Sequence, residues 1–205
     1  MSNLTDFIGG DAPLKYDNVY EFKASGTFTV PQSGKYLALV IGSGGGSKSF
    51  NGYGGGAGEL KTAILSLTKG DNIQITVGKA VPMDNAGQTT SVGNYLSAIG
   101  GTVDGGGHAQ QSTPDRVLSP FLTNMLRLKT SIAKGGTAPT GSSGDGGAGE
   151  AGYGDFKLTI DTQDPNSATG AEGGYGYGAG AGGDGASYYD RSAIRSAQGY
   201  CLIIG

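Results

Sequence analysis

The chain has 205 residues, of which 42 are glycine and 7 are proline, and its 14 basic and 17 acidic residues give a net charge of −3. The glycine and proline content falls just under the roughly 25–30% that marks aperiodic low-complexity chains, so composition alone does not indicate disorder. The small negative charge is unlike the basic footprint of nucleic-acid-binding proteins or of proteins that bind anionic membranes. No apolar stretch approaches the ~20 residues of a membrane helix. We therefore expect no nucleic acid partner and no membrane insertion.

The N-terminal residues differ in character from the rest of the chain. We expect an attachment or oligomerisation segment over 1–19, followed by one glycine-rich β domain over 20–205. Leu4, Phe7 and Ile8 fall on one face of a helix. A helix this short is stable only when it docks on another surface. These three side chains are therefore candidates for attachment to a larger assembly, and the alternative is a frayed terminus.

Short apolar or alternating segments recur along the chain and are separated by turn residues. The segment 20–30 reads as a strand pair around Ser25, and 69–71 is predicted to be a hairpin turn. The pattern at 72–77 alternates with a period of two, which is typical of a half-buried strand. Further strands are predicted at 35–41, 60–67, 89–92, 97–100, 156–160 and 199–204. The sequence therefore predicts a mainly β fold, with a β-sandwich or jelly-roll-like body.

One segment, 119–130, is predicted to be a short helix instead. Ser119 suits the N-cap and Pro120 suits the first helical position. The apolar residues that follow form one broad stripe: Phe121, Leu122, Met125, Leu126 and Leu128. We expect this helix either to cover the core or to contact a partner.

Glycine is concentrated in clusters that lie between the predicted strands. Interior glycines cost a helix about 0.5–1 kcal/mol each relative to alanine, and a strand made of glycine has few side chains to bury. Such clusters are either disordered linkers or extended polyglycine II helices, which share the geometry of polyproline II. Their repeated position between strands favours packed polyglycine II helices joined by backbone hydrogen bonds. The clusters are 42–46, 52–58, 105–107, 135–154 and 168–187.

Residues able to support catalysis or metal binding are scarce. The single cysteine, Cys201, lies in an apolar strand, which favours a buried and inert thiol. His108 is the single histidine, and most acid–base catalysis and most zinc sites depend on histidine side chains, so the sequence offers few residues for either. The glycine run before Lys48 lacks the Gly-Lys-Ser/Thr order of a phosphate-binding loop, and 161–166 lacks the spacing of a calcium loop. We expect no enzymatic activity, no cofactor and no metal.

The order of the motifs is more specific than any one of them. Phe-Thr-Val-Pro stands at 28–31, a glycine run at 42–46, Gly-Asp-Asn-Ile-Gln-Ile-Thr-Val-Gly at 70–78, Thr-Ser-Val-Gly at 90–93 and Gly-Tyr-Cys-Leu-Ile-Ile at 199–204. In this order the chain resembles the glycine-rich domain of tail fibres and related adhesins of tailed bacteriophages. The apolar segment 115–133 has no counterpart in that pattern.

The resemblance implies a bacteriophage tail fibre or tail-tip adhesin that is not an enzyme. Such a protein is located in the virion, on the tail or another peripheral appendage, and is made in the bacterial host cytoplasm. Its partners would be other tail or fibre proteins and a host cell-surface receptor, either a glycan or an outer-membrane protein. A homo-oligomer, specifically a trimer, is expected. The alternative is a structural virion component, such as a collar, head-fibre or baseplate decoration, with no receptor role.

Receptor contact is expected in loops between the glycine runs, chiefly 47–53, 104–111 and 139–143, because binding residues gather in loops on a rigid scaffold. The candidate receptor-binding residues are Phe50, Tyr53, His108, Gln110, Tyr188 and Tyr189. Phe50 and Tyr53 could stack on a sugar ring or a protein surface. Alternatively, these two rings seal the ends of the glycine rods.

Overall fold

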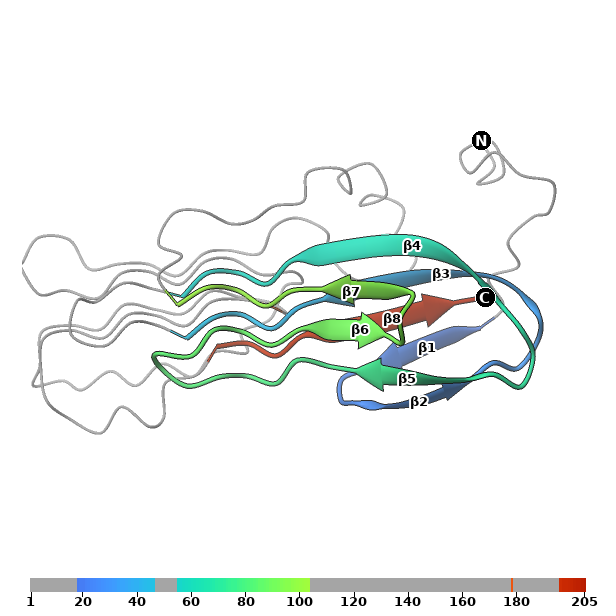
Figure 1. Cartoon of the computed structure of the whole chain (residues 1–205), viewed down its shortest axis with the longest axis horizontal. Helices are drawn as coiled ribbons and strands as arrows, with labels where there is room; N and C mark the ends of the chain where they lie inside the picture. The colour runs from blue at the N-terminus through green and yellow to red at the C-terminus, as the bar shows by residue number, and fades with distance from the viewer. Residues whose placement is uncertain (1–17, 47–54, 104–177, 179–195) are drawn as a thin grey trace, which may run out of the picture.

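The computed structural model describes residues 18–46, 55–103, 178 and 196–205, and within them the fold is mainly β with no helix (Figure 1). The described strands form two antiparallel sheets. Sheet A has the order β1-β8-β3-β4 and sheet B the order β2-β5-β6-β7. The strands are β1 Val19–Phe22, β2 Gly26–Thr29, β3 Gly34–Ile41, β4 Leu60–Leu67, β5 Asn72–Thr76, β6 Thr90–Val92, β7 Leu96–Ala98 and β8 Tyr200–Ile204.

The predicted strand positions are confirmed wherever the structure describes them, but two predicted pairings are wrong. The strands on either side of Ser25 do not pair with each other, because β1 pairs with β8 in sheet A and β2 pairs with β5 in sheet B. The residues 69–71 do form a turn, with Gly70 at a φ of 89°, but it joins β4 of one sheet to β5 of the other and is therefore not a hairpin. The predicted strand 156–160 and the predicted helix 119–130 lie outside the described residues.

Both errors have the same physical cause. The local pattern of apolar and polar residues indicates where a strand lies, but it does not indicate which strand will pair with it. β1 finds its partner in β8, the strand at the far end of the chain, with Val19 opposite Ile204. The connection between β1 and β2 is held in place from sheet B, because the Ser25 hydroxyl accepts a hydrogen bond from the Val77 N–H at 2.9 Å. The chain therefore crosses between sheets where a hairpin was expected.

The two sheets enclose one hydrophobic core between their facing sides. The alternation predicted for β5 is confirmed, since Ile73 and Ile75 are buried while their neighbours are exposed. Phe28 packs against the rings of Tyr20, Phe22 and Tyr36, with centroid separations of 4.8, 6.3 and 5.9 Å. The core consists of Phe28, Val30, Tyr36, Ala38, Val40, Leu65, Leu67, Ile73, Ile75, Val77, Val92, Ala98, Cys201 and Ile203.

Core side chains become smaller toward one end of the sheets. Aromatic and long aliphatic groups, such as Phe28 and Tyr36, lie at the end near the C-terminus. At the opposite end the core narrows to residues such as Val40, Ala98 and Cys201, which are all fully buried. Facing sheets are normally about 10 Å apart because large side chains fill the space between them. A core that tapers in this way lets the two sheets converge.

The pairing register of the sheets continues beyond their last strand residues at the narrow end. Ile41 of β3 pairs with Leu60 of β4, and the Gly42 N–H then donates to the Glu59 carbonyl at 2.9 Å. On the other side of β3, Ile41 pairs with Tyr200, and the Gly44 N–H then donates to the Ala197 carbonyl at 2.9 Å. The sheets therefore run without interruption into the glycine-rich segments.

Candidate functional site: the glycine bundle

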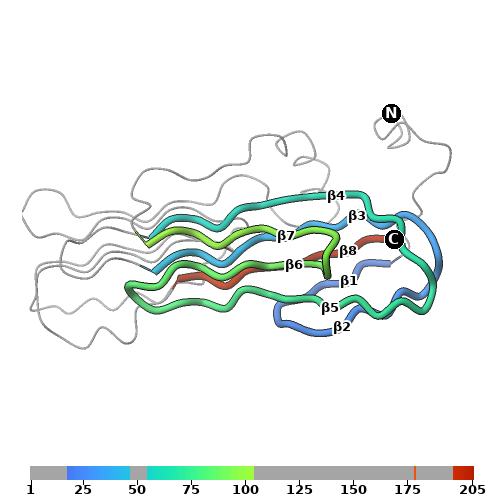
Figure 2. The backbone as a smooth tube through the Cα atoms, viewed as in Figure 1, coloured from blue at the N-terminus to red at the C-terminus, as the bar shows by residue number. Residues whose placement is uncertain are grey.

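Six backbone segments extend from the strands at the narrow end of the core, and Figure 2 shows them running side by side. We call them the glycine bundle, and we include the single described residue of the densest glycine cluster, Gly178. Each segment is the direct continuation of a strand or leads directly into one. The segments are 42–46, 55–59, 78–81, 85–88, 99–102 and 196–199.

The central segment, 42–46, contacts its neighbours with a three-residue repeat. Gly42 and Gly45 donate hydrogen bonds to the segment 55–59, at the carbonyls of residues 59 and 56. Ser43 and Gly46 donate to the segment 85–88, at the carbonyls of residues 88 and 85, and Gly44 donates to residue 197. Successive residues therefore reach three different neighbours, and every third residue returns to the same one. A β-strand repeats every two residues, whereas polyproline II geometry has three residues per turn.

The same spacing recurs between other segments. The N–H groups of Glu59 and Gly56 donate to the carbonyls of Ile99 and Thr102, both at 2.9 Å. Those of Gly199 and Ser196 donate to residues 78 and 81 at 2.8 and 3.0 Å. In each of these pairs the segments are antiparallel and the bonds are three residues apart. Several of these bonds join sheet A segments to sheet B segments, so backbone hydrogen bonds replace the hydrophobic contact between the sheets.

Glycine is required because the backbones approach too closely for side chains. A Cβ added at Gly42 would lie 2.0 Å from the carbonyl oxygen of Ile99, and one at Gly58 would lie 2.0 Å from that of Gly42. Rigid backbone surrounds both positions, so no side-chain movement relieves the overlap. The same holds for Gly45, Gly46, Gly55, Gly100 and Gly101, each of which would place a Cβ at 2.0 Å from a backbone atom. The predicted packing of the glycine runs is therefore confirmed for 42–46 and 55–58. The clusters 105–107, 135–154 and, apart from Gly178, 168–187 lie outside the described residues.

Three buried hydroxyls accept backbone hydrogen bonds near the junction of the sheets and the bundle. The Ser43 hydroxyl accepts from the Gln88 N–H at 2.7 Å, and that of Thr90 accepts from the Gly78 N–H at 3.0 Å. The Ser196 hydroxyl accepts from the Val81 N–H at 3.0 Å. All three side chains are fully buried. A buried amide N–H without an acceptor destabilises the folded state. These hydroxyls therefore accept hydrogen bonds from backbone N–H groups that the pairing between segments leaves without a partner.

The end of the bundle away from the sheets is where the undescribed loops attach. The described stretches that follow β3 and β7 and that precede β4 and β8 end on this side, at Gly46, Val103, Gly55 and Ser196 (Figure 1). Between Val103 and Ser196 the chain is also described at Gly178, which bonds to Gly58 and Gln198 inside the bundle. One connection at the same end, 82–86, is described. Asp84 there has a φ of 58°, and Asn85 is exposed while its side-chain amide donates to the Met83 carbonyl at 2.7 Å. Sequence analysis assigned no role to this turn, although its Pro-Met-Asp-Asn-Ala composition is typical of a turn.

None of the residues proposed for binding or attachment is described, so the structure brings none of them together. The candidate receptor-binding residues Phe50, Tyr53, His108, Gln110, Tyr188 and Tyr189, and the candidate attachment residues Leu4, Phe7 and Ile8, all lie outside the described residues. The structure does define where the loop with Phe50 and Tyr53 begins and ends. Gly46 and Gly55 belong to neighbouring antiparallel rods of the bundle.

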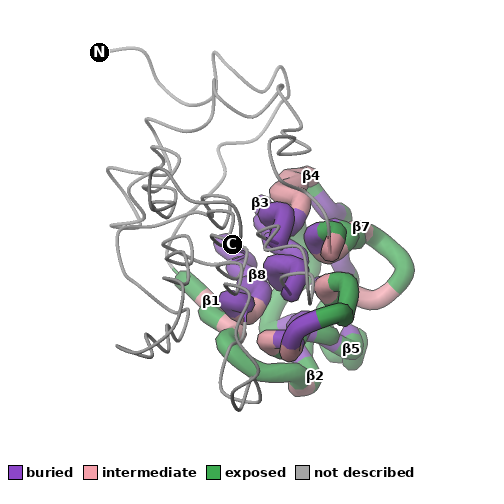
Figure 3. Tube along the Cα trace, turned by 90° about the vertical axis from the view of Figure 1, so that its left-hand side faces the viewer, coloured by how far each residue is buried: buried purple, intermediate pink, exposed green. Residues whose placement is uncertain are grey.

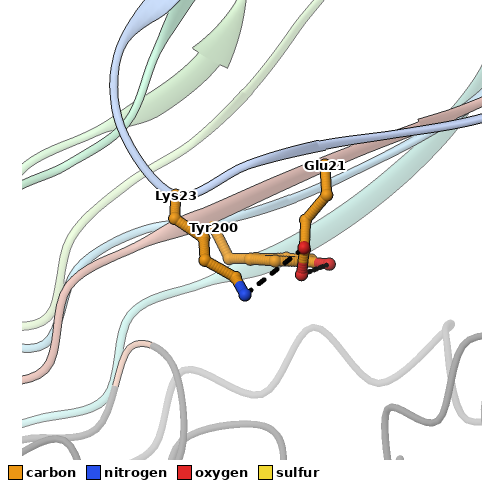
Figure 4. A network of polar contacts seen from close by, with 3 residues as sticks. All are labelled: Glu21, Lys23 and Tyr200. Atoms are coloured by element: carbon orange, nitrogen blue, oxygen red, sulfur yellow. Dashed lines mark hydrogen bonds and ion pairs between the residues drawn. The ribbon is translucent and has the colours of Figure 1, made fainter.

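The polar side chains of the described residues form contacts that hold neighbouring parts of the fold together. Figure 4 shows the Tyr200 hydroxyl donating to the Glu21 carboxylate at 2.8 Å, and the same carboxylate lying 3.3 Å from the Lys23 ammonium. Side chains of the ion pair are about half exposed, so the pair contributes little to stability. The described part of the chain contains no group of three acidic, histidine or cysteine residues that could hold a metal ion. No helix long and apolar enough to cross a membrane is found in that part either.

Cys201 is confirmed as a buried thiol. It lies on β8 with its side chain in the core, and its burial raises the pKa to about 12. The thiol therefore stays protonated at neutral pH, whereas the thiolate is the nucleophilic form of cysteine. Its environment is that of an inert core side chain.

Comparison with known proteins adds no relative to these observations. No protein-family model matches the chain, and no curated protein sequence matches it. The functional conclusion therefore depends on the geometry of the bundle and on the motif order of the sequence.

Proposed function

We propose that this chain is a non-enzymatic bacteriophage tail fibre or tail-tip adhesin, located in the virion, that binds a host cell-surface receptor. The observation that carries the proposal is the glycine bundle: rods with a three-residue hydrogen-bond repeat, from one end of which several loops emerge. Rods of this kind, with receptor specificity in the loops between them, are what the resemblance to phage adhesins implies. A rigid bundle suits such a role because it holds loop ends in fixed positions.

The finer architecture is part of the same proposal. We infer that the two described sheets form a β-sandwich-like body, that the bundle rods are polyglycine II helices, and that 119–130 forms a short helix. The body would face the virion and the rods would face the host. The attachment residues Leu4, Phe7 and Ile8 would contact another tail or fibre protein, and the assembled protein would be a trimer. Light scattering of the purified protein measures the oligomeric state directly.

A competition assay tests receptor binding. Purified wild-type protein should block adsorption of the phage to susceptible cells. Alanine replacements at Phe50, Tyr53, His108 and Gln110 should each weaken this effect by about 1–3 kcal/mol if the residues are hot spots. The matched control is Thr27→Ala on the exposed outer face of sheet B, which should leave adsorption unchanged.

The outcome separates the two functions that the motif order allows. Loss of competition in the loop variants, with the thermal melting of the wild type, supports the adhesin. Wild-type protein that is present in labelled virions but never affects adsorption would contradict it. That result would assign the chain the role of a structural virion component.

A further inference from the structure

Gly178 forms hydrogen bonds to two segments of the bundle that lead into different strands. Its carbonyl accepts from the Gly58 N–H at 2.8 Å, and its own N–H donates to the Gln198 carbonyl at 2.9 Å. The segment 55–59 leads into β4 and the segment 196–199 leads into β8. In sheet A these two strands lie on either side of β3. Gly178 therefore bridges two segments that flank the continuation of β3.

This bridge lies on the side of sheet A that points away from sheet B. Ala38 and Val40 of β3 belong to the core between the sheets. Because side chains alternate along a strand, Ile41 points to the opposite face. A Cβ added at Gly178 would lie 2.9 Å from the Cγ2 atom of Ile41 and 2.7 Å from the carbonyl oxygen of Gly42. Gly178 is therefore placed over the point where β3 passes into the bundle (Figure 3 shows sheet A from the bundle end).

Glycine is required at this position for two independent reasons. The residue is buried and has a φ of 73°, which lies in the left-handed region that side chains with a Cβ seldom adopt. None of the described residues in the six segments of the bundle shares this sign of φ. The close carbonyl oxygen of Gly42 also leaves no room for a Cβ. Gly178 is thus held in a conformation different from that of the segments to which it bonds.

We propose that Gly178 is an anchor that fixes the chain between β7 and β8 to the bundle and divides it into two separately held stretches. The stretch 104–177 follows Val103 and ends at the anchor. The stretch 179–195 begins at the anchor and ends at Ser196, in the same segment to which the anchor donates its hydrogen bond. The anchor consists of backbone groups only, and it does not depend on what the protein binds.

Amide hydrogen exchange in the full-length wild-type protein, followed residue by residue by NMR, is the first test. The Gly178 N–H should exchange at least about a hundredfold more slowly than in an unfolded chain, because its hydrogen bond is buried. The Gly58 N–H, which bonds to the carbonyl of the same residue, should be protected as well. A Gly178 amide that exchanges at the rate of an unfolded chain would overturn the proposal.

A substitution at the anchor separates a local role from a general one. In Gly178→Ala, the Gly58 amide should exchange about tenfold faster or more, whereas the Gly44 amide, which bonds to Ala197, should change by less than about threefold. The control is Gly70→Ala, because Gly70 also has a positive φ but nothing lies within 4 Å of an added Cβ. It should leave the ratio of the Gly58 and Gly44 exchange rates unchanged.

The other outcomes of this substitution count against the anchor. An unchanged rate at Gly58 would show that the bridge contributes nothing. Equal acceleration at Gly58 and Gly44 would show that Gly178 supports the whole bundle and does not act locally. If Gly178→Ala yields no soluble protein, the wild-type exchange of the Gly178 amide decides.

Cutting the chain tests the division into two stretches. A recognition site for a specific protease is inserted after Thr140, and the purified protein is then cleaved. Because the anchor holds the stretch 179–195 from its other end, the Gly178 amide should keep its protection to within about threefold of the uncut protein. The uncut protein with the same insertion is the control. Loss of protection on cleavage would show that the two stretches are not held separately.

Discussion

The sheet body and the glycine bundle share strand register but are held together by different forces. Between the sheets, large side chains fill the space and bury apolar surface, as Ile75 and Phe28 do. In the bundle, the backbones meet directly and each rod bonds to several neighbours. The change occurs within one continuous stretch of the chain, for example where β3 ends at Ile41 and the bundle segment begins at Gly42. Removal of side chains is therefore what converts a two-layer sheet into a bundle of rods.

This comparison predicts opposite requirements at the two ends. The body should suffer when a side chain is removed, and the bundle should suffer when one is added. Replacements of matched residues in the two regions test the difference.

Adding a methyl group in the bundle should have the largest effect. Gly42→Ala or Gly58→Ala places a Cβ at 2.0 Å from a backbone carbonyl oxygen, so two rods must separate. We expect a loss of more than about 4 kcal/mol of the unfolding free energy, or no soluble protein. The control is Gly26→Ala, where nothing lies within 4 Å of the added Cβ and melting should change little. Wild-type thermal melting of Gly42→Ala would show that the rods do not pack closely.

Removing a side chain from the body should cost less. Ile75 is fully buried in the core, and Ile75→Ala should lower the unfolding free energy by about 2–5 kcal/mol, measured by urea unfolding. Ile64→Ala is the control, because Ile64 is 41% exposed and its replacement should change the free energy by about 0.5 kcal/mol or less. Equal effects at the two positions would contradict the assigned core.

Removing a buried hydroxyl near the junction should have a smaller effect again. Ser43→Ala leaves the Gln88 N–H without its acceptor at 2.7 Å, which should cost about 1–3 kcal/mol. Ser97→Ala, at an exposed position of β7, is the control and should stay within about 0.5 kcal/mol of the wild type. A Ser43→Ala protein with wild-type stability would indicate that another group, such as water, takes over the hydrogen bond.

Alkaline pH should have the smallest effect, through Cys201. Burial raises the pKa of the folded-state thiol from 9.0 to about 12, so between these values the unfolded chain loses a proton that the folded protein keeps. Stability from this group is complete well below pH 9 and falls as the pH rises, by about 1.4 kcal/mol between pH 8 and pH 10. Cys201→Ala should lack this component when urea unfolding is compared at both pH values. An identical pH dependence in the two proteins would contradict the raised pKa.

Local sequence pattern predicted the strands well because residue alternation is a local property. The period-two pattern of β5 and the apolar character of β8 both identified real strands. Pattern failed where partners had to be chosen, as when β1 joined β8 in place of β2. For the candidate site, the glycine clusters pointed to packed rods, and their described members are packed. The turn 82–86 was missed because a short polar connection looks the same at either end of the molecule.

The sequence by itself determined that this protein is mainly β, that its cysteine is buried and that its glycine clusters lie between strands. These features follow from residue periodicity and from the loss of side chains, which need no knowledge of neighbours. The tertiary structure alone decided which strands share a sheet, where the sheets converge and which rods bond to one another. The reason is that backbone N–H groups are chemically alike, so the sequence does not specify which carbonyl group each of them will bond to. Gly44 finds residue 197 only because β3 and β8, far apart in the chain, already lie in register.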